Sequence, residues 1–93
     1  MKMSETTVRY SPTPNPNAGK FTVSRPVVDG PASRSFYNAE DAADHPLAAA
    51  LFELEGVSSV FMVADFVTVT KAADAGWDRL VPEVQSVIER ILA

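Results

Sequence analysis

The stretch VSSVFMVADFVTVT, residues 57–70, decides the fold. Residues 57–63 and 66–70 are two runs rich in β-branched and aromatic side chains, and only Ala64 and Asp65 separate them. Such residues favour extended strands, and a two-residue connection is typical of a tight β-hairpin. In the second run, valines alternate with threonines, which is the period of a strand with one buried face. The segment therefore predicts an antiparallel hairpin.

Three shorter strands are predicted nearer the N-terminus. Thr7–Tyr10 and Lys20–Val23 carry apolar side chains at every second position, and Ser33–Tyr37 offers a brief third run. Residues 11–20, SPTPNPNAGK, cannot form a helix, because proline lacks an N–H and biases the preceding residue toward extended backbone. We expect this segment to project as an ordered loop that is longer than a two-residue hairpin turn.

The C-terminal segment predicts a helix from about Trp77 to Leu92. Apolar residues recur there at steps of three, four and one, which places them on one stripe: Leu80, Val84, Val87, Ile88, Ile91 and Leu92. A proline is tolerated only near the start of a helix. Pro82 therefore predicts an irregular first turn or a regular helix that begins at Val81 or Pro82, with Trp77 packed as a lid over its entrance.

The middle of the chain predicts a helix in two parts. Asn38 is a suitable cap for a first short helix, which the proline at residue 46 interrupts. Asp44 or His45 then caps a second helix over residues 46–55, and Gly56 ends it. Because helices do not alternate with the strands, the sheet should be mostly antiparallel with the helices packed on one face. The fold class is therefore α+β, a two-layer sandwich.

Length and composition limit the function. The chain has 93 residues, enough for a single domain over 1–93, in which residues 1–6 should be flexible. It contains no cysteine and one histidine, so it supplies no disulfide, no thiolate ligand for an iron-sulfur cluster and no pair of histidines for a metal. We predict no catalytic residues, no metal site and no cofactor. Without a membrane-length apolar run or a secretory signal, a cytoplasmic location is expected.

Charge is divided unevenly along the chain. The net charge is −4, which argues against binding to nucleic acid. Residues 1–36 nevertheless hold five basic and two acidic residues, whereas residues 37–93 hold three basic and ten acidic ones. The basic third can steer an anionic partner to one face of the protein, or it can be an ordinary solvated surface.

Three blocks of sequence resemble the N-terminal domain of the Nfu and NifU-like iron-sulfur scaffold proteins. They are TPNPNAGKF at Thr13–Phe21, FYNAEDAADHPLAAALFELEGVSSVF at Phe36–Phe61, and DFVTVTK at Asp65–Lys71, which Trp77 follows. The resemblance covers roughly residues 8–92. It implies a small α/β domain that, in full-length members, precedes a second domain whose CxxC pair bridges a cluster between subunits. This chain resembles a stand-alone copy of the first domain.

The best binding candidate is the proline-asparagine loop with the basic residues near it. Its residues are Thr13, Asn15, Asn17 and Lys20, together with Arg9, Arg25 and Arg34. A stiff loop holds amides and carbonyls in place for a partner, although Asn-Pro pairs also serve simply to lock turns. We expect a non-enzymatic adaptor in iron-sulfur cluster assembly or delivery that binds a cluster scaffold or an apo iron-sulfur protein. The alternative is a general peptide-binding or phosphopeptide-binding module, in which the basic residues contact anions.

Overall fold

The computed structural model describes residues 6–28 and 32–92. Its seven elements, in chain order, are β1 (Val8–Pro12), β2 (Ala18–Val23), β3 (Ser33–Phe36), α1 (Pro46–Phe52), β4 (Val57–Val63), β5 (Phe66–Lys71) and α2 (Trp77–Leu92). All five predicted strands are present. Residues 1–6 were predicted to be flexible. Of these, residues 1–5 lie outside the described part of the chain, and Thr6 lies inside it.

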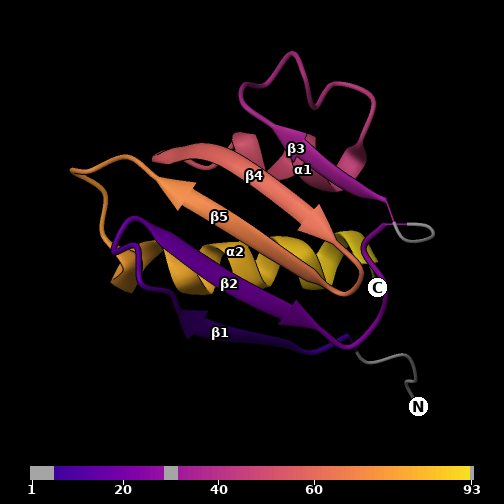
Figure 1. Cartoon of the computed structure of the whole chain (residues 1–93), viewed down its shortest axis with the longest axis horizontal. Coiled ribbons are helices and arrows are strands. Elements are labelled where there is room, and N and C mark those ends of the chain that lie inside the picture. The colour runs from indigo at the N-terminus through magenta and orange to yellow at the C-terminus, as the bar shows by residue number, and fades with distance from the viewer. Residues whose placement is uncertain (1–5, 29–31, 93) are drawn as a thin grey trace.

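The five strands form one sheet in the order β1-β2-β5-β4-β3, and every neighbouring pair is antiparallel. The β4–β5 hairpin is the predicted one, with Val63 paired to Phe66 across the Ala64–Asp65 turn. Both helices lie on the same side of the sheet, behind the strands in the view of Figure 1. The prediction of an α+β two-layer sandwich is therefore confirmed.

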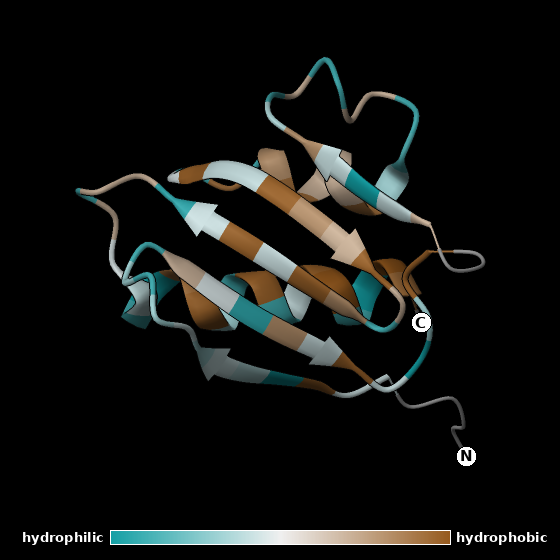
Figure 2. Cartoon of the chain, viewed as in Figure 1, coloured by the Kyte–Doolittle hydropathy of each residue, from teal (hydrophilic) through white to brown (hydrophobic). Residues whose placement is uncertain are grey.

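The core lies between the sheet and the two helices. Every second residue of the central strands is buried, and the side chains of Phe21, Val67 and Val69 are fully inaccessible to solvent. The alternation is visible as bands of differing hydropathy along the strands in Figure 2. From the other layer, α1 contributes Leu51 and α2 contributes Ile88, both fully buried. Period-two strands and a helical stripe thus meet in one apolar layer.

Helix α2 spans the predicted residues, Trp77–Leu92, but its first turn is regular and does not wait for Val81 or Pro82. It is continuous from Trp77, and Pro82 lies inside it. The Leu80 N–H donates to the Gly76 carbonyl over 3.1 Å, so the first turn is already helical. Pro82 removes one backbone hydrogen bond close to the N-terminal end, and it is exposed, so its ring does not disturb the buried stripe.

The first predicted helix of the middle segment is wrong. Residues 38–44 form successive turns, although the Asn38 Oδ1 does accept a hydrogen bond from the Asp41 N–H at 2.8 Å. The second helix starts as predicted, with His45 as its N-cap, but ends at Phe52 and not at residue 55. After Phe52 the backbone forms turns, in which the Glu53 and Leu54 N–H groups donate to carbonyls three residues earlier, and Gly56, at a φ of 100°, leads the chain into β4.

Strands β1 and β2 both extend further into the segment that connects them than the sequence predicts. Pro12 pairs with Gly19, so the connection spans only residues 13–17 and residues 18–20 belong to β2. Pro12 is compatible with a strand because β1 is at the edge of the sheet, where one side of the backbone needs no partner. The predicted ordered loop is therefore a five-residue hairpin loop.

Candidate functional site

The hairpin loop at residues 13–17 is held by its own side chains. The Thr13 Oγ1 accepts from the Asn15 N–H at 3.1 Å and lies 2.9 Å from the Asn15 and Ala18 carbonyl oxygens. The Asn15 Oδ1 accepts from the Asn17 N–H at 2.9 Å, which is the hydrogen bond of an Asx turn. Asparagine and threonine at these positions therefore set the backbone conformation of the loop.

Two residues from the C-terminal half anchor this loop to the rest of the fold. Lys71, which is 9% exposed, places its Nζ 3.2 Å from the Asn17 Oδ1, and its N–H donates to the Asn17 carbonyl over 2.7 Å. The Trp77 Nε1 donates to the Pro16 carbonyl over 2.9 Å. The loop is thus tied both to the end of β5 and to the first residue of α2.

Three aromatic side chains, Tyr10, Phe21 and Trp77, pack together next to the loop. The rings of Tyr10 and Trp77 have centroids 5.7 Å apart, and Phe21 lies 5.3 Å from Tyr10. Gly19 passes so close to this cluster that a Cβ there would lie 2.7 Å from a ring carbon of Tyr10. A glycine is needed because the rings of Tyr10 and Trp77 occupy the space that a side chain would fill.

These contacts bear directly on the predicted binding residues. The side-chain oxygens of Thr13, Asn15 and Asn17 all take part in hydrogen bonds within the chain. This geometry favours the turn-locking interpretation of the asparagines, and a direct binding role for them remains a prediction. What the loop offers a partner is a fixed shape at one end of the sheet.

Arg9 and Lys20 project from the sheet face that no helix covers. Both are exposed, and they alternate with buried or half-buried neighbours on β1 and β2. The Lys20 Nζ lies 4.5 Å from the centre of the Phe66 ring, a cation–π contact between β2 and β5. On β4, Phe61 is 37% exposed, which is high for a phenylalanine within a central strand. We call Arg9, Lys20, Phe61 and Phe66 the outer-face group.

Arg25 and Arg34 lie elsewhere, so the predicted basic residues do not form one patch. The Arg25 Nη1 donates to the carbonyl of Leu92 at the C-terminal end of α2, where a cation is favoured by the helix dipole. Arg34 is on β3, at the opposite edge of the sheet from β1, and its register partner Met62 is buried on the helix side. The arginine therefore faces away from Lys20.

Sequence reasoning missed Phe61 and Lys71. Both follow from strand alternation, because Phe61 lies between the buried residues Val60 and Met62, and Lys71 is two positions beyond the buried Val69. The alternation that places valine in the core also places the Lys71 stem there, with its ammonium group reaching the loop.

The described residues contain no grouping of three histidine, aspartate or glutamate side chains suited to a metal ion. Neither described helix is both long and apolar enough to cross a membrane. The Glu40, Asp41 and Asp44 side chains lie on exposed turns before α1.

Comparison with known proteins agrees with this fold along nearly the whole chain. Residues 8–93 match the family described as "Scaffold protein Nfu/NifU N terminal". The chain belongs to the Nfu/NifU N-terminal family. NifU-like protein 5, mitochondrial, of Arabidopsis thaliana is 41% identical over 81 residues, which cover 87% of this chain and 29% of that protein. The NFU1 iron-sulfur cluster scaffold homolog, mitochondrial, of Drosophila erecta shows the same identity and coverage. The chain thus spans under a third of these relatives.

Two solved structures of similar proteins share the fold. The crystal structure of protein SAV1430 from Staphylococcus aureus has a TM-score of 0.78 and 33% identity, covering 89% of this chain and 99% of that one. The solution structure of a NifU-like protein from Saccharomyces cerevisiae has a TM-score of 0.84 and 27% identity, covering 99% and 85%. Membership of this family relates the chain to iron-sulfur cluster biology.

Proposed function

We propose that this Nfu/NifU N-terminal domain is a non-enzymatic adaptor that binds a cluster scaffold or an apo iron-sulfur protein through the outer face of its sheet. The carrying observation is the outer-face group, in which the exposed Phe61 on β4 lies diagonally across the uncovered sheet face from Phe66 on β5, with exposed cations on β2 and β1. An apolar centre with a charged rim is the usual anatomy of a protein interface. Family membership supports the choice of an iron-sulfur protein as the partner.

The charges favour a partner whose contacting surface is acidic. Arg9 pairs with Thr22 and Lys20 pairs with Ser11, so the two cations lie diagonally across the adjacent strands β1 and β2, and Lys20 contacts the Phe66 ring. Complementary charges steer encounter and set orientation, while the apolar contacts supply most of the affinity. The hydrogen-bonded loop at residues 13–17 connects the same two strands, so its fixed backbone would form one edge of the binding surface.

The cluster itself would be held by the partner. Iron-sulfur clusters are held mainly by cysteine thiolates, and this chain has none. Anaerobic reconstitution of the purified chain with iron and sulfide should therefore give no stoichiometric visible absorption band. A band at one cluster per chain would contradict this part of the proposal. The cytoplasmic location expected from the sequence remains a prediction, and the Arabidopsis thaliana and Drosophila erecta relatives are named as mitochondrial proteins.

The test measures binding to a purified cluster scaffold and to an apo iron-sulfur enzyme by calorimetry. Phe61→Asp should lower affinity at least about 30-fold, since a buried interface aromatic contributes about 2 kcal/mol or more. Tyr37→Asp is the matched control, because Tyr37 is 71% exposed and lies outside the outer-face group, just after β3. Equal binding by wild type, Phe61→Asp and Tyr37→Asp would overturn the proposed surface.

A charge reversal tests the role of Lys20, and the class of ligand that binds separates the adaptor from a phosphopeptide-binding module. Lys20→Glu should weaken binding of an iron-sulfur protein partner several-fold and flatten its salt dependence, with Arg90→Glu on the exposed part of α2 as the control. If phosphopeptides bind and iron-sulfur proteins do not, the adaptor function is wrong. The separation of Arg34 from Lys20 argues against the phosphopeptide alternative, because a phosphate needs converging cations.

A further inference from the structure

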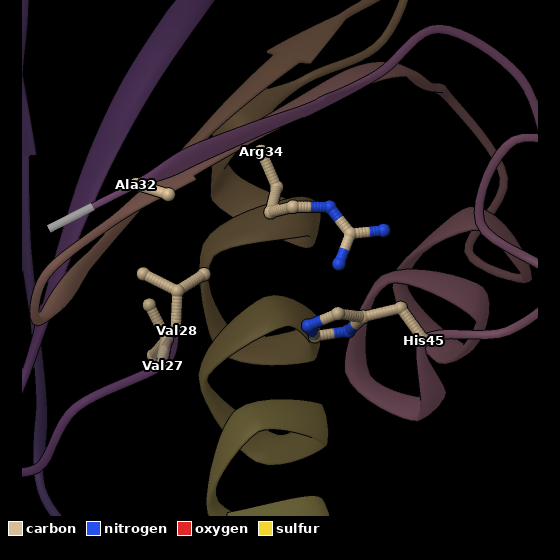
Figure 3. A pocket seen from close by; sticks show the side chains of 5 residues that line it. All are labelled: Val27, Val28, Ala32, Arg34 and His45. Carbon is tan, nitrogen blue, oxygen red and sulfur yellow. The ribbon is translucent and has the colours of Figure 1, made fainter. Parts of the chain in front are cut away.

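A small cavity opens on the helix side of the sheet, away from the outer-face group. Its volume is about 250 Å³, and its lining residues are Val27, Val28, Ala32, Arg34 and His45. Figure 3 shows that they come from three segments: the chain after β2, the β3 strand with the residue before it, and the cap of α1. One end of the cavity is polar and the other is lined by aliphatic side chains.

Arg34 forms one side of the polar end. Its guanidinium carbon lies 5.1 Å from the centre of the Phe36 ring, a contact that orients the group, and Figure 3 shows it extending toward His45. One guanidinium nitrogen lies 4.0 Å from a carboxylate oxygen of Asp44, whose side chain is 81% exposed. An ion pair of this length with an exposed carboxylate is weak, so most of the five N–H donors of the guanidinium are available to other acceptors.

His45 forms the other side of the polar end. Its Nδ1 accepts a hydrogen bond from the Ala48 N–H at 3.3 Å, and the ring packs edge-on against Phe36 with centroids 5.4 Å apart. An Nδ1 that accepts must be unprotonated, so the neutral ring carries its proton on Nε2 and can donate there. In Figure 3 the imidazole reaches into the cavity beneath the guanidinium. The two groups thus present donors to the same space.

We propose that this cavity binds the carboxylate of a small branched aliphatic acid or of a peptide C-terminus, with Arg34 and the His45 Nε2–H as donors. A guanidinium matches the planar, two-oxygen geometry of a carboxylate, and a neutral imidazole adds a third donor. Val27, Val28 and Ala32 contact the aliphatic part of the ligand. The volume is below the roughly 300–1,000 Å³ usual for drug-sized ligands, which restricts the ligand to a small acid or to one terminal residue.

The site is independent of the adaptor surface. Arg34 and Lys20 project from opposite faces of the sheet, so a ligand at one does not contact the other. The donors are side chains, because the Ala48 N–H at the start of α1 is already bonded to His45. Loss of partner binding at the outer face would therefore leave carboxylate binding unchanged, and the reverse also holds.

The first test uses isovalerate as the probe and the imidazole resonances of His45 as the readout. His45 is the sole histidine in the sequence, so its carbon-bound ring protons are a unique signal. Saturable shifts with a Kd on the order of 1 mM are expected for isovalerate, and no saturable shift for the neutral isovaleramide. Binding of the anion should also raise the pKa of His45. Equal shifts with the amide, or no saturation by about 10 mM isovalerate, would overturn the proposal.

Variants locate the site. Arg34→Gln should abolish the shifts, and Arg34→Lys should weaken binding at least about fivefold, because lysine lacks the planar fork. Arg90→Gln is the matched control, since it makes the same charge change on the exposed part of α2, outside both binding surfaces, and should bind isovalerate as wild type does. Retained isovalerate binding by a folded Arg34→Gln variant would show that the donors are wrongly assigned.

A binding experiment with peptides identifies the source of the carboxylate. A tripeptide ending in valine is compared with its C-terminally amidated form and with free isovalerate. Tighter binding of the free-acid peptide indicates a protein C-terminus, and tighter binding of isovalerate indicates a metabolite. Binding of the amidated peptide as well as the free acid would contradict carboxylate recognition.

Discussion

The Trp77 indole N–H donates to the Pro16 carbonyl over 2.9 Å, joining the first residue of α2 to a loop 61 positions earlier in the chain. The same indole packs on Tyr10 and Phe21. Trp77 was predicted to cover the entrance of the helix, and the structure shows that it also holds the hairpin loop against the fold. Loop shape and helix position are therefore coupled through one side chain.

Trp77→Phe should keep most of the ring packing and lose the hydrogen bond to Pro16. We expect a loss of about 1 kcal/mol in the free energy of unfolding, which is typical of one hydrogen bond. Trp77→Ala removes packing as well and should cost more. Because Trp77 is the sole tryptophan, unfolding should be followed by circular dichroism in denaturant. Equal stabilities of the two variants would show that the ring itself contributes little.

Asn17→Ala should destabilise the fold by about 1–3 kcal/mol, because it removes an acceptor of the buried Lys71 ammonium group. Lys71→Met removes the charge that needs this acceptor. In the Lys71→Met background the same Asn17→Ala change should therefore cost much less. Urea melts of the four proteins give the coupling between the two residues. Additive losses would mean that the two side chains do not interact.

Leu51→Ala or Ile88→Ala should each lower stability by about 2–5 kcal/mol, since both side chains are fully buried and truncation leaves a cavity. Ser86→Ala on the exposed side of α2 serves as the control and should stay within about 0.5 kcal/mol of the parent. Losses below about 0.5 kcal/mol for the core variants in denaturant melts would contradict the packing described.

Two turns should respond in opposite directions to changes between glycine and alanine. Gly56 has a φ of 100°, and a Cβ there would lie 2.9 Å from the Ala75 Cβ, so Gly56→Ala should cost about 1–2 kcal/mol or more. Ala64 occupies the hairpin turn with a φ of 53°, where glycine is less strained. Ala64→Gly should raise stability by about 0.5 kcal/mol after the entropy cost of glycine. Thermal melts compare both variants with the parent.

Stability should fall as the pH is lowered through the range in which an unfolded histidine gains its proton. Burial, and to a smaller extent the Arg34 guanidinium, lower the pKa of His45, against an opposing effect of Asp44. The unfolded chain then binds a proton more readily than the folded chain does, so acid favours unfolding and stability rises with pH across this range.

His45→Asn tests this pH dependence while keeping a side-chain acceptor at the N-cap of α1. Urea melts from about pH 7.5 to 5.5 should show a smaller decline for the variant than for the parent, because the histidine contribution is absent. Parallel declines in the two proteins would assign the pH dependence to the carboxylates.

Periodicity predicted the elements well where one face of an element is buried. The β4–β5 hairpin and the stripe on α2 are both as predicted, because alternation and helical spacing report burial directly. The errors fall at ends and turns. Asn38 makes the expected cap hydrogen bond, yet residues 38–44 remain turns, since a local cap cannot supply the packing that stabilises a short helix.

The sequence by itself determined the two-layer class, the buried faces and the absence of thiolate ligands, because these depend on residue type and local spacing. Only the tertiary structure decided which residues meet. The strand order puts β3 at the opposite edge of the sheet from β1, so Arg34 joins His45 at a cavity, while Arg9 and Lys20 lie on the outer face. Contacts between residues far apart in the chain depend on strand order and register, which local patterns do not encode.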